Sequence, residues 1–159
     1  MDAITQRILR SLDRATGDLR RGQGLFLYES DGRVESLDFS QSLESSTSGL
    51  LVFSVDHADS RVLEMIQQPG GSPGQLLVTA MRAHRLGLAE DTLGPDISIS
   101  LPPSASLDWA RFVALANWDD RTPPSAAHRN ASASGTAALK LAKTAPCLPA
   151  LLARSMTFE

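Results

Sequence analysis

The run Leu50–Val55 (LLVFSV) constrains the fold of this chain more than any other segment. It is almost continuously apolar and rich in residues that favour strands, so it predicts a strand buried on both faces and central in a sheet. Further strands are expected from short apolar or alternating runs bounded by turn residues. These runs are Gly24–Glu29, Arg33–Phe39, Gln75–Thr79, Asp96–Leu101 and the final LPALLA, residues 148–153.

Helices are predicted between these strands by apolar residues at spacings of three and four and by capping residues. The expected helices run from Ile4 to Leu19 with a stop at Gly22, from a cap at Asp56 or Asp59 to Gln67, from a cap at Thr79 to Gly87, from a cap at Ser106 through Leu115, and from Ser134 to Thr144. Alternating strands and helices favour an α+β or α/β fold, with a mixed sheet covered by helices.

The chain has 159 residues and a mass of 17.0 kDa, which suits one compact domain over residues 1–159. Two polar segments rich in Ser and Thr or in Pro, Ser and Asn, residues 41–49 and 119–135, are predicted to be flexible loops.

Composition excludes several classes of function. No apolar run reaches the roughly 18 residues that a bilayer span needs, and the start MDAITQRILR lacks the features of a signal peptide. A net charge of −3 without a lysine-rich block argues against nucleic acid as a partner. The single cysteine, Cys147, allows neither an internal disulfide nor a zinc site built on cysteines. We therefore expect a cytoplasmic protein without membrane contact.

Two groups of residues are candidates for a site, and each has a simpler explanation. Asp56 and His57 follow the strand Leu50–Val55 and offer an acid–base pair, but a helix cap and a surface histidine are the favoured explanation of these two residues. Arg82 and Arg85, with Arg61, offer an anion-binding patch, although arginines on a short helix are usually solvated. Residue chemistry alone therefore predicts no catalytic or metal site.

Three stretches carry a family resemblance by their order and spacing. They are RATGDLRRGQGLFLYESDG (Arg14–Gly32), QLLVTAMRAHRLGLAED (Gln75–Asp91) and AALKLAKTAPCLPALLA (Ala137–Ala153). Together they resemble the N-terminal domain of bacterial two-domain GTP cyclohydrolase II proteins of riboflavin biosynthesis. That domain is itself similar to 3,4-dihydroxy-2-butanone 4-phosphate synthase. The resemblance implies an α+β fold with a mixed sheet covered by helices, a shortened form of the synthase fold.

The catalytic motifs of the synthase family are not retained. The family's acidic loop, Arg-Glu-x-Glu-Gly-Asp, supplies carboxylates that hold magnesium for enolisation of a sugar phosphate. In the corresponding stretch here, Arg33 and Asp38 match, but Val34 and Ser36 replace the two glutamates. Aligning Leu50–Ala58 with the strand after the hairpin instead removes the loop altogether.

The family's Gly-His-Thr-Glu element is also absent, since Arg129 and Asn130 follow His128. No catalytic residue is therefore carried over from the synthase. The cyclohydrolase reaction itself resembles zinc-dependent hydrolysis with three cysteine ligands, and this chain has one cysteine.

The resemblance implies a catalytically silent domain without a cofactor, which works with the catalytic domain of GTP cyclohydrolase II in cis or in trans. Its role would be structural, oligomerising, for instance as a homodimer, or regulatory. One alternative is a degenerate lyase on ribulose 5-phosphate, with magnesium or substrate held by Arg33, Glu35, Asp38 and His57. Another is a sensor that binds a phosphorylated metabolite near Arg33, Arg82 and Arg85.

Overall fold

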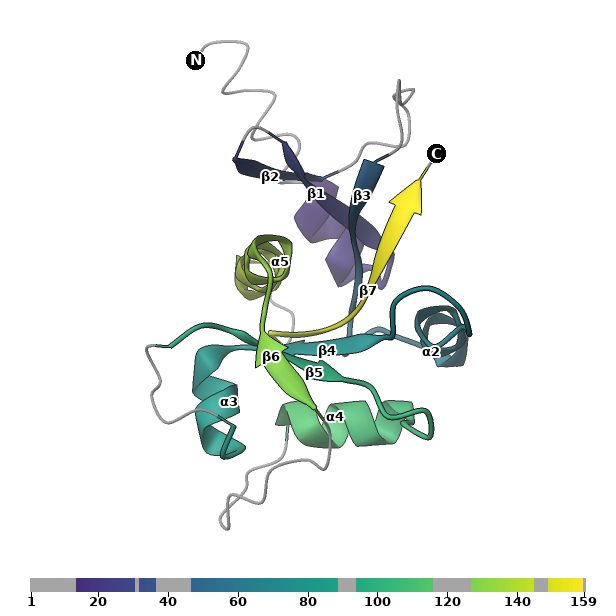
Figure 1. Cartoon of the computed structure of the whole chain (residues 1–159), viewed down its shortest axis with the longest axis vertical. Coiled ribbons are helices and arrows are strands. Elements are labelled where there is room, and N and C mark those ends of the chain that lie inside the picture. The colour runs from purple at the N-terminus through teal and green to yellow at the C-terminus, as the bar shows by residue number, and fades with distance from the viewer. Residues whose placement is uncertain are drawn as a thin grey trace.

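A computed structural model describes residues 14–30, 32–36, 47–88, 94–115, 127–144 and 149–158 of the chain. Its centre is one seven-stranded sheet in the order β2-β1-β3-β7-β4-β5-β6 (Figure 1). The strands are β1 (Leu25–Ser30), β2 (Arg33–Ser36), β3 (Thr47–Ser54), β4 (Gln75–Val78), β5 (Ile97–Ser100), β6 (His128–Asn130) and β7 (Ala150–Phe158).

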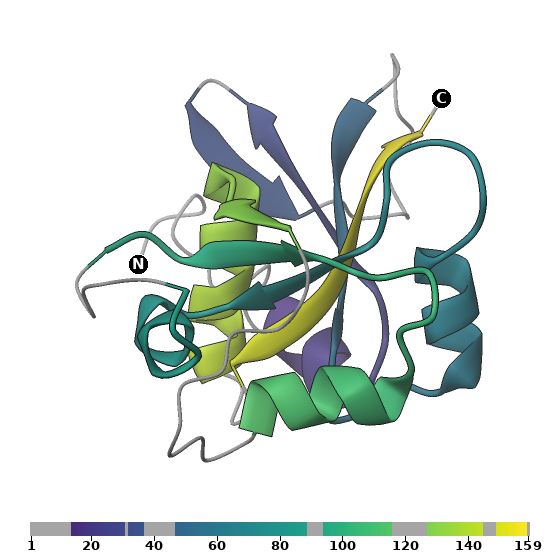
Figure 2. The ribbon, with the colours of Figure 1, turned by 60° about the horizontal axis from the view of Figure 1, so that its bottom comes forward.

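The last strand holds the two halves of the sheet together. β7 pairs along its whole length with β3, from Thr47 opposite Phe158 to Ser54 opposite Leu151. On its other side β7 pairs with β4 only through residues 150–153. Beyond that point the two halves diverge, and β7 curves away from β4 in both views of the ribbon (Figures 1 and 2).

Helices cover both faces of the sheet. α2 (Ser60–Ile66), α3 (Ala80–Arg85) and α4 (Leu107–Leu115) pack on one face, where Ile66, Ala83 and Val113 join a core with Phe53. A helix over residues 14–20 and α5 (Ala133–Thr144) cover the other face, in a core that includes Val52. Figure 2 shows these helices on the two sides of the sheet.

The α+β class is confirmed, and so is the burial of the central run. Leu50 and Val52 are buried in one core, and Leu51 and Phe53 are buried in the other, because alternate residues of a strand face opposite sides. Helices of both layers therefore cover this strand, as its composition predicts.

The predicted helix boundaries also match the structure where it describes them. Asp59 caps α2, with its carboxylate accepting from Val62 N–H at 3.0 Å, and Thr79 caps α3 through Arg82 N–H at 3.2 Å. Gly22 has a φ of 76° and follows the helix over residues 14–20, where it and Gln23 satisfy the last carbonyls. A left-handed glycine at this position is the common way to end a helix. Residues 1–13 lie outside the described part.

Three predictions need correction. The sheet is antiparallel in all six described pairings rather than mixed, since β7 returns antiparallel to both β3 and β4. Residues 47–49, expected in a loop, belong to β3, because a polar strand end pairs well with the equally polar end of β7. Within the predicted loop 119–135, residues 128–130 form β6 and α5 begins at Ala133. Residues 41–46 and 119–126 lie outside the described part.

No helix in the described ranges combines the length and apolar character that a membrane span requires.

Strands β1 and β3 approach each other closely at Gly49, which gives a direct test of the β1–β3 register. A Cβ atom at Gly49 would lie 2.2 Å from the Leu27 carbonyl oxygen. We expect Gly49→Ala to destabilise the fold by about 1–3 kcal/mol, measured by urea unfolding, because the backbone must shift.

The control is Gly17→Ala in the helix over residues 14–20, where a Cβ would meet only the end of the Arg21 side chain. This change should be neutral or stabilise by up to ~1 kcal/mol. Equal stability of the Gly49→Ala variant and the parent chain would contradict the register.

Candidate functional site

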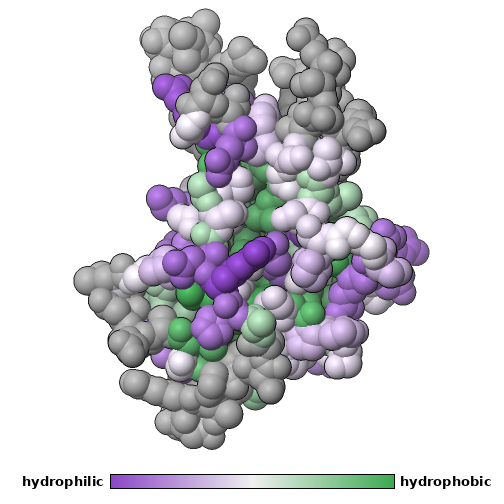
Figure 3. Space-filling model, in the orientation of Figure 1, coloured by the Kyte–Doolittle hydropathy of each residue, from purple (hydrophilic) through white to green (hydrophobic). Residues whose placement is uncertain are grey.

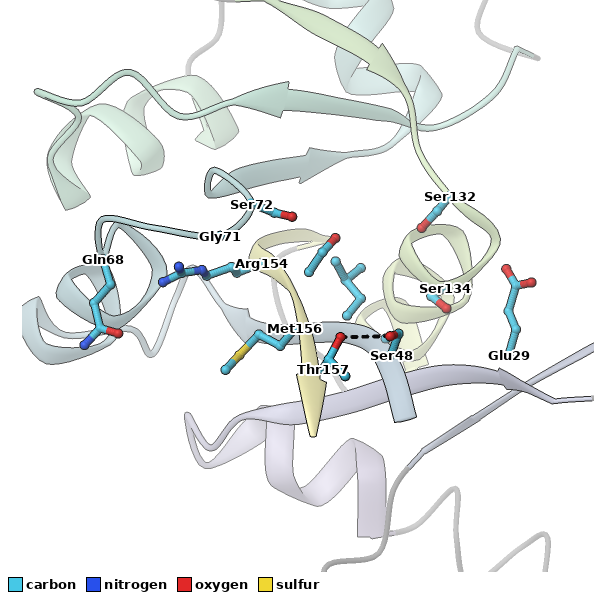
Figure 4. A pocket seen from close by; sticks show the side chains of 13 residues that line it. Glu29, Ser48, Gln68, Gly71, Ser72, Ser132, Ser134, Arg154, Met156 and Thr157 are labelled. Carbon is cyan, nitrogen blue, oxygen red and sulfur yellow. Dashed lines mark hydrogen bonds between the residues drawn. The ribbon is translucent and has the colours of Figure 1, made fainter. Parts of the chain in front are cut away.

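A hollow opens where β7 separates from β4, and it is the best candidate site in the described part of the chain. Its volume is about 750 Å³, within the range of small-molecule sites. Figure 4 shows the hollow with β7 between the segment after α2 and the start of α5. Its lining residues are Glu29, Ser48, Gly49, Leu50, Gln68, Gly71, Ser72, Ser132, Ser134, Arg154, Ser155, Met156 and Thr157.

Arg154 fixes one wall of the hollow. Its guanidinium donates to the Met65 carbonyl oxygen at 2.9 Å and to the Gly70 carbonyl oxygen, so it ties the segment after α2 to β7. The two positive-φ glycines Gly70 and Gly71 let the chain turn tightly here. Arg154 therefore positions this wall and brings one positive charge to its rim.

The start of α5 forms the opposite wall. The Ser132 hydroxyl accepts from Gly135 N–H at 3.1 Å and caps the helix. Ser134, in the first turn of the helix, is only 7% exposed and also lines the hollow. A serine hydroxyl at such a rim both donates and accepts hydrogen bonds, so it can contact a ligand or water in the hollow.

The floor of the hollow is the paired polar end of β3 and β7. The hydroxyls of Ser48 and Thr157 share a hydrogen bond of 2.8 Å across the two strands (Figure 4). With Ser72, Ser132, Ser134 and Ser155, six hydroxyls line the site beside one carboxylate, that of Glu29, and one guanidinium. Hydroxyls both donate and accept, so this lining suits a small polar ligand.

Of the described residues that the lyase alternative requires, His57 lies apart from Arg33 and Glu35, which share one face of β2. Arg33 lies opposite Ser30 at the hairpin turn, and Glu35 accepts a hydrogen bond from the Tyr28 hydroxyl at 3.1 Å. His57 follows the opposite end of β3, where it lies against Gly22. Asp38 lies outside the described residues.

Arg82 and Arg85 are neighbours on α3, and neither contributes to the hollow. Partial burial lowers the pKa of the Arg82 guanidinium, and the nearby Arg85 cation lowers it further. The two arginines thus concentrate positive charge on α3, and neither belongs to the lining of the hollow.

In the part of the chain that the structure describes, no three His, Cys, Asp or Glu side chains gather as a metal site would require. Magnesium prefers several carboxylate oxygens, and the described lining of the hollow offers one carboxylate. The described residues of the hollow therefore do not fit a magnesium site.

Sequence reasoning missed the residues that line the hollow. Ser132 and Ser134 both lie within residues 119–135, which were predicted as a loop, although a serine directly before a helical pattern is a usable capping signal. Arg154, Ser155 and Thr157 follow the predicted strand 148–153, and their place depends on pairing with a segment a hundred residues away. Only the polar residues directly after an apolar strand hint at a site there.

Comparison with solved structures places the fold among those of 3,4-dihydroxy-2-butanone 4-phosphate synthases. The crystal structure of RibBX, a two-domain synthase of this kind from A. baumannii, matches with a TM-score of 0.62 and 13% sequence identity. The match covers 91% of this chain and 47% of RibBX, so the chain spans about half the length of that protein. At this identity the likeness concerns the fold. No family model and no curated protein sequence matches the chain.

The two serines at the start of α5 should differ in their effect on stability. Ser132→Ala removes the helix cap and should cost about 1 kcal/mol in urea unfolding. Ser134→Ala removes a hydroxyl that lines the hollow and does not cap the helix, so its effect on the free energy of unfolding should be within about 0.5 kcal/mol. The reverse order of the two effects would contradict this geometry.

Arg154 should matter for stability although it lies on the surface. Arg154→Met keeps the apolar stem but loses the bonds to the Met65 and Gly70 carbonyls. We expect a loss of about 1 kcal/mol, or about 2–4 °C in Tm by calorimetry. Arg129→Met on the exposed strand β6 is the control and should leave Tm unchanged. Equal Tm values for the two variants would show that Arg154 does not hold this wall.

Proposed function

We propose that this chain is a catalytically silent, synthase-like domain that works with GTP cyclohydrolase II in riboflavin biosynthesis, in cis or in trans, in the cytoplasm. Its role is structural, oligomerising or regulatory. The observation that carries this proposal is the combination of a synthase-like fold over 91% of the chain with a hollow lined by hydroxyls, among whose described residues only Glu29 is acidic.

The chemistry of the hollow supports binding rather than lyase activity. Enolisation of a sugar phosphate needs a base and a way to stabilise an oxyanion, for which synthases use carboxylates and magnesium. Serine and threonine hydroxyls at neutral pH supply neither without a neighbouring base. They do supply hydrogen bonds to a polar metabolite, so the hollow favours a regulatory role.

The lyase alternative gains no support from the geometry. Glu35 lies on the edge strand β2 and is hydrogen-bonded to Tyr28, and His57 lies beyond the far end of β3. Two groups that act on one substrate must lie within reach of the same atoms. We therefore retain the silent-domain proposal alone.

An assay of formate release from ribulose 5-phosphate with magnesium tests the silence directly. We expect no release above the buffer background from the purified chain, because the described hollow lacks the acid–base groups. Glu35→Gln and Asp38→Asn are the informative variants, since each removes one of the two candidate carboxylates. Magnesium-dependent release of formate that either variant abolishes would overturn the proposal in favour of the lyase.

A regulatory role predicts a ligand-dependent gain in stability. A metabolite that binds the folded state at a hundred times its Kd should raise the free energy of unfolding by ~2.7 kcal/mol. Ribulose 5-phosphate, GTP and a flavin are the compounds to compare in a thermal-shift assay. Ser134→Val should abolish the shift, and absence of any shift would confine the role to structure or assembly.

Recovery of the native protein from its own cells tests the association. Its intact mass and its co-purifying proteins distinguish the two forms of the proposal. A mass well above 17.0 kDa, continuing into a cyclohydrolase, supports a domain in cis. A mass of 17.0 kDa with cyclohydrolase co-recovered supports a separate subunit. A mass of 17.0 kDa without any co-recovered cyclohydrolase would contradict the association.

A further inference from the structure

The main-chain groups of β7 point alternately to its two sides, and the structure fixes which residues point where. Val55 N–H donates to the Ala150 carbonyl oxygen at 3.3 Å, so Ala150 directs its main-chain groups toward β3. In an antiparallel ladder this direction alternates residue by residue. Arg154 and Met156 therefore also bond to β3, and Ser155 and Thr157 direct their N–H and C=O groups to the opposite side.

That opposite side is occupied only along the first part of β7. β4 pairs with Leu151 and Ala153, and its ladder ends at Gln75, which lies opposite Ala153. In the described ranges of the chain, no strand pairs with Ser155 or Thr157 on this side. The N–H and C=O groups of these two residues form an open strand edge along the hollow, called here the inner edge.

The inner edge differs from the two outer edges of the sheet. β6, at one outer edge, is three residues long, fully exposed and carries Arg129. In Figure 3 the strongly hydrophilic band near the middle of the view lies over the position of this strand. β2, at the other outer edge, is four residues long and carries Arg33 and Glu35. Short charged edges resist pairing with other strands, whereas the inner edge has neutral hydroxyl side chains.

The inner edge is recessed, and this selects the kind of strand that can reach it. Ser132, which caps α5, and Ser134 in its first turn stand on one side of the hollow, and Ser72 and Gln68 of the segment after α2 stand on the other (Figure 4). A strand that pairs with the inner edge must therefore lie between these walls. The edge of β7 in a second copy would bring its own two walls with it, so self-pairing is disfavoured.

We propose that the inner edge is a docking site for an extended peptide segment of a partner protein, which adds a strand to β7 at Ser155 and Thr157. Such strand addition takes its affinity from main-chain hydrogen bonds and its specificity from alternate side chains. The proposal deepens the proposed function, and it rests on that function only for the expectation that a partner exists.

The two faces of β7 define the chemistry of the peptide. Ser155 and Thr157 share a face with Ala153, which belongs to the core under α5, so on this face the peptide meets hydroxyls. Arg154 and Met156 share the face of Leu152. A segment with small polar residues on one face, and with an apolar and an acidic residue on the other, matches both.

A proline at Ser155 tests the main-chain contact. Ser155→Pro removes the N–H that points to the inner edge, and proline is tolerated at strand positions whose N–H is unpaired. Ser155→Ala keeps the N–H and loses only the hydroxyl, so it is the matched control. Circular dichroism and Tm should show both variants folded, whereas Met156→Pro should lower Tm sharply because its N–H bonds to β3.

The probe is a phage-displayed library of short random peptides, selected on the whole chain. We expect enrichment of extended sequences with the alternating pattern given above. A synthetic copy of the best one should bind Ser155→Ala nearly as well as the parent chain and bind Ser155→Pro at least about tenfold more weakly. Enrichment of no peptide, or equal binding to the folded proline and alanine variants, would overturn the proposal.

Light scattering of the parent chain and of Ser155→Pro tests whether a second copy of the chain, instead of a peptide, occupies the inner edge. A dimer that the proline converts to a monomer would show that a second copy fills the inner edge, and this too would overturn the proposal. These outcomes are separate from the formate assay: release of formate would refute catalytic silence and leave peptide binding untouched, and failure of peptide binding would leave the silent domain standing.

Discussion

The double pairing of β7 is the interaction on which the rest of the structure depends. β3 and β4 each have other partners in the sheet, but only β7 joins the half that contains β1 to the half that contains β5. Its residues 150–153 are buried, because they are covered by helices on both faces and by strands on both sides. Loss of this ladder would remove the hydrogen-bonded connection between the two half-sheets, and both cores contain residues from each half, so both helical layers rely on it.

The same strand creates the candidate site by leaving one of its partners. After Ala153 the ladder with β4 stops while the ladder with β3 continues to Phe158. The divergence opens the hollow, and Arg154 and the start of α5 keep its walls in place. A synthase-like fold with hydroxyls in its hollow illustrates that a fold is a scaffold, whereas function is decided by the side chains placed on it.

Local signals predicted the parts of this fold that local interactions determine. The apolar run at Leu50–Val55, the caps at Asp59 and Thr79 and the stop at Gly22 all depend on neighbours within a few residues. β6 was missed because His128–Asn130 is polar and gains its strand form only from pairing with β5. The hollow was missed because Ser48 meets Thr157 through a contact between distant segments. Arg33, Glu35 and His57 were considered together for their chemistry, but the register places His57 at the other end of β3 from the two β2 residues.

Amide hydrogen exchange along β7, resolved by residue with NMR, tests the central claim most directly. If β7 pairs with β3 throughout and with β4 only up to Ala153, the amides of Leu151–Ala153, Arg154 and Met156 should exchange slowly. The amides of Ser155 and Thr157 should exchange far faster than those of their immediate neighbours. Uniform protection from Leu151 to Thr157 would contradict the open inner edge, and uniform fast exchange beyond Ala153 would contradict the ladder with β3.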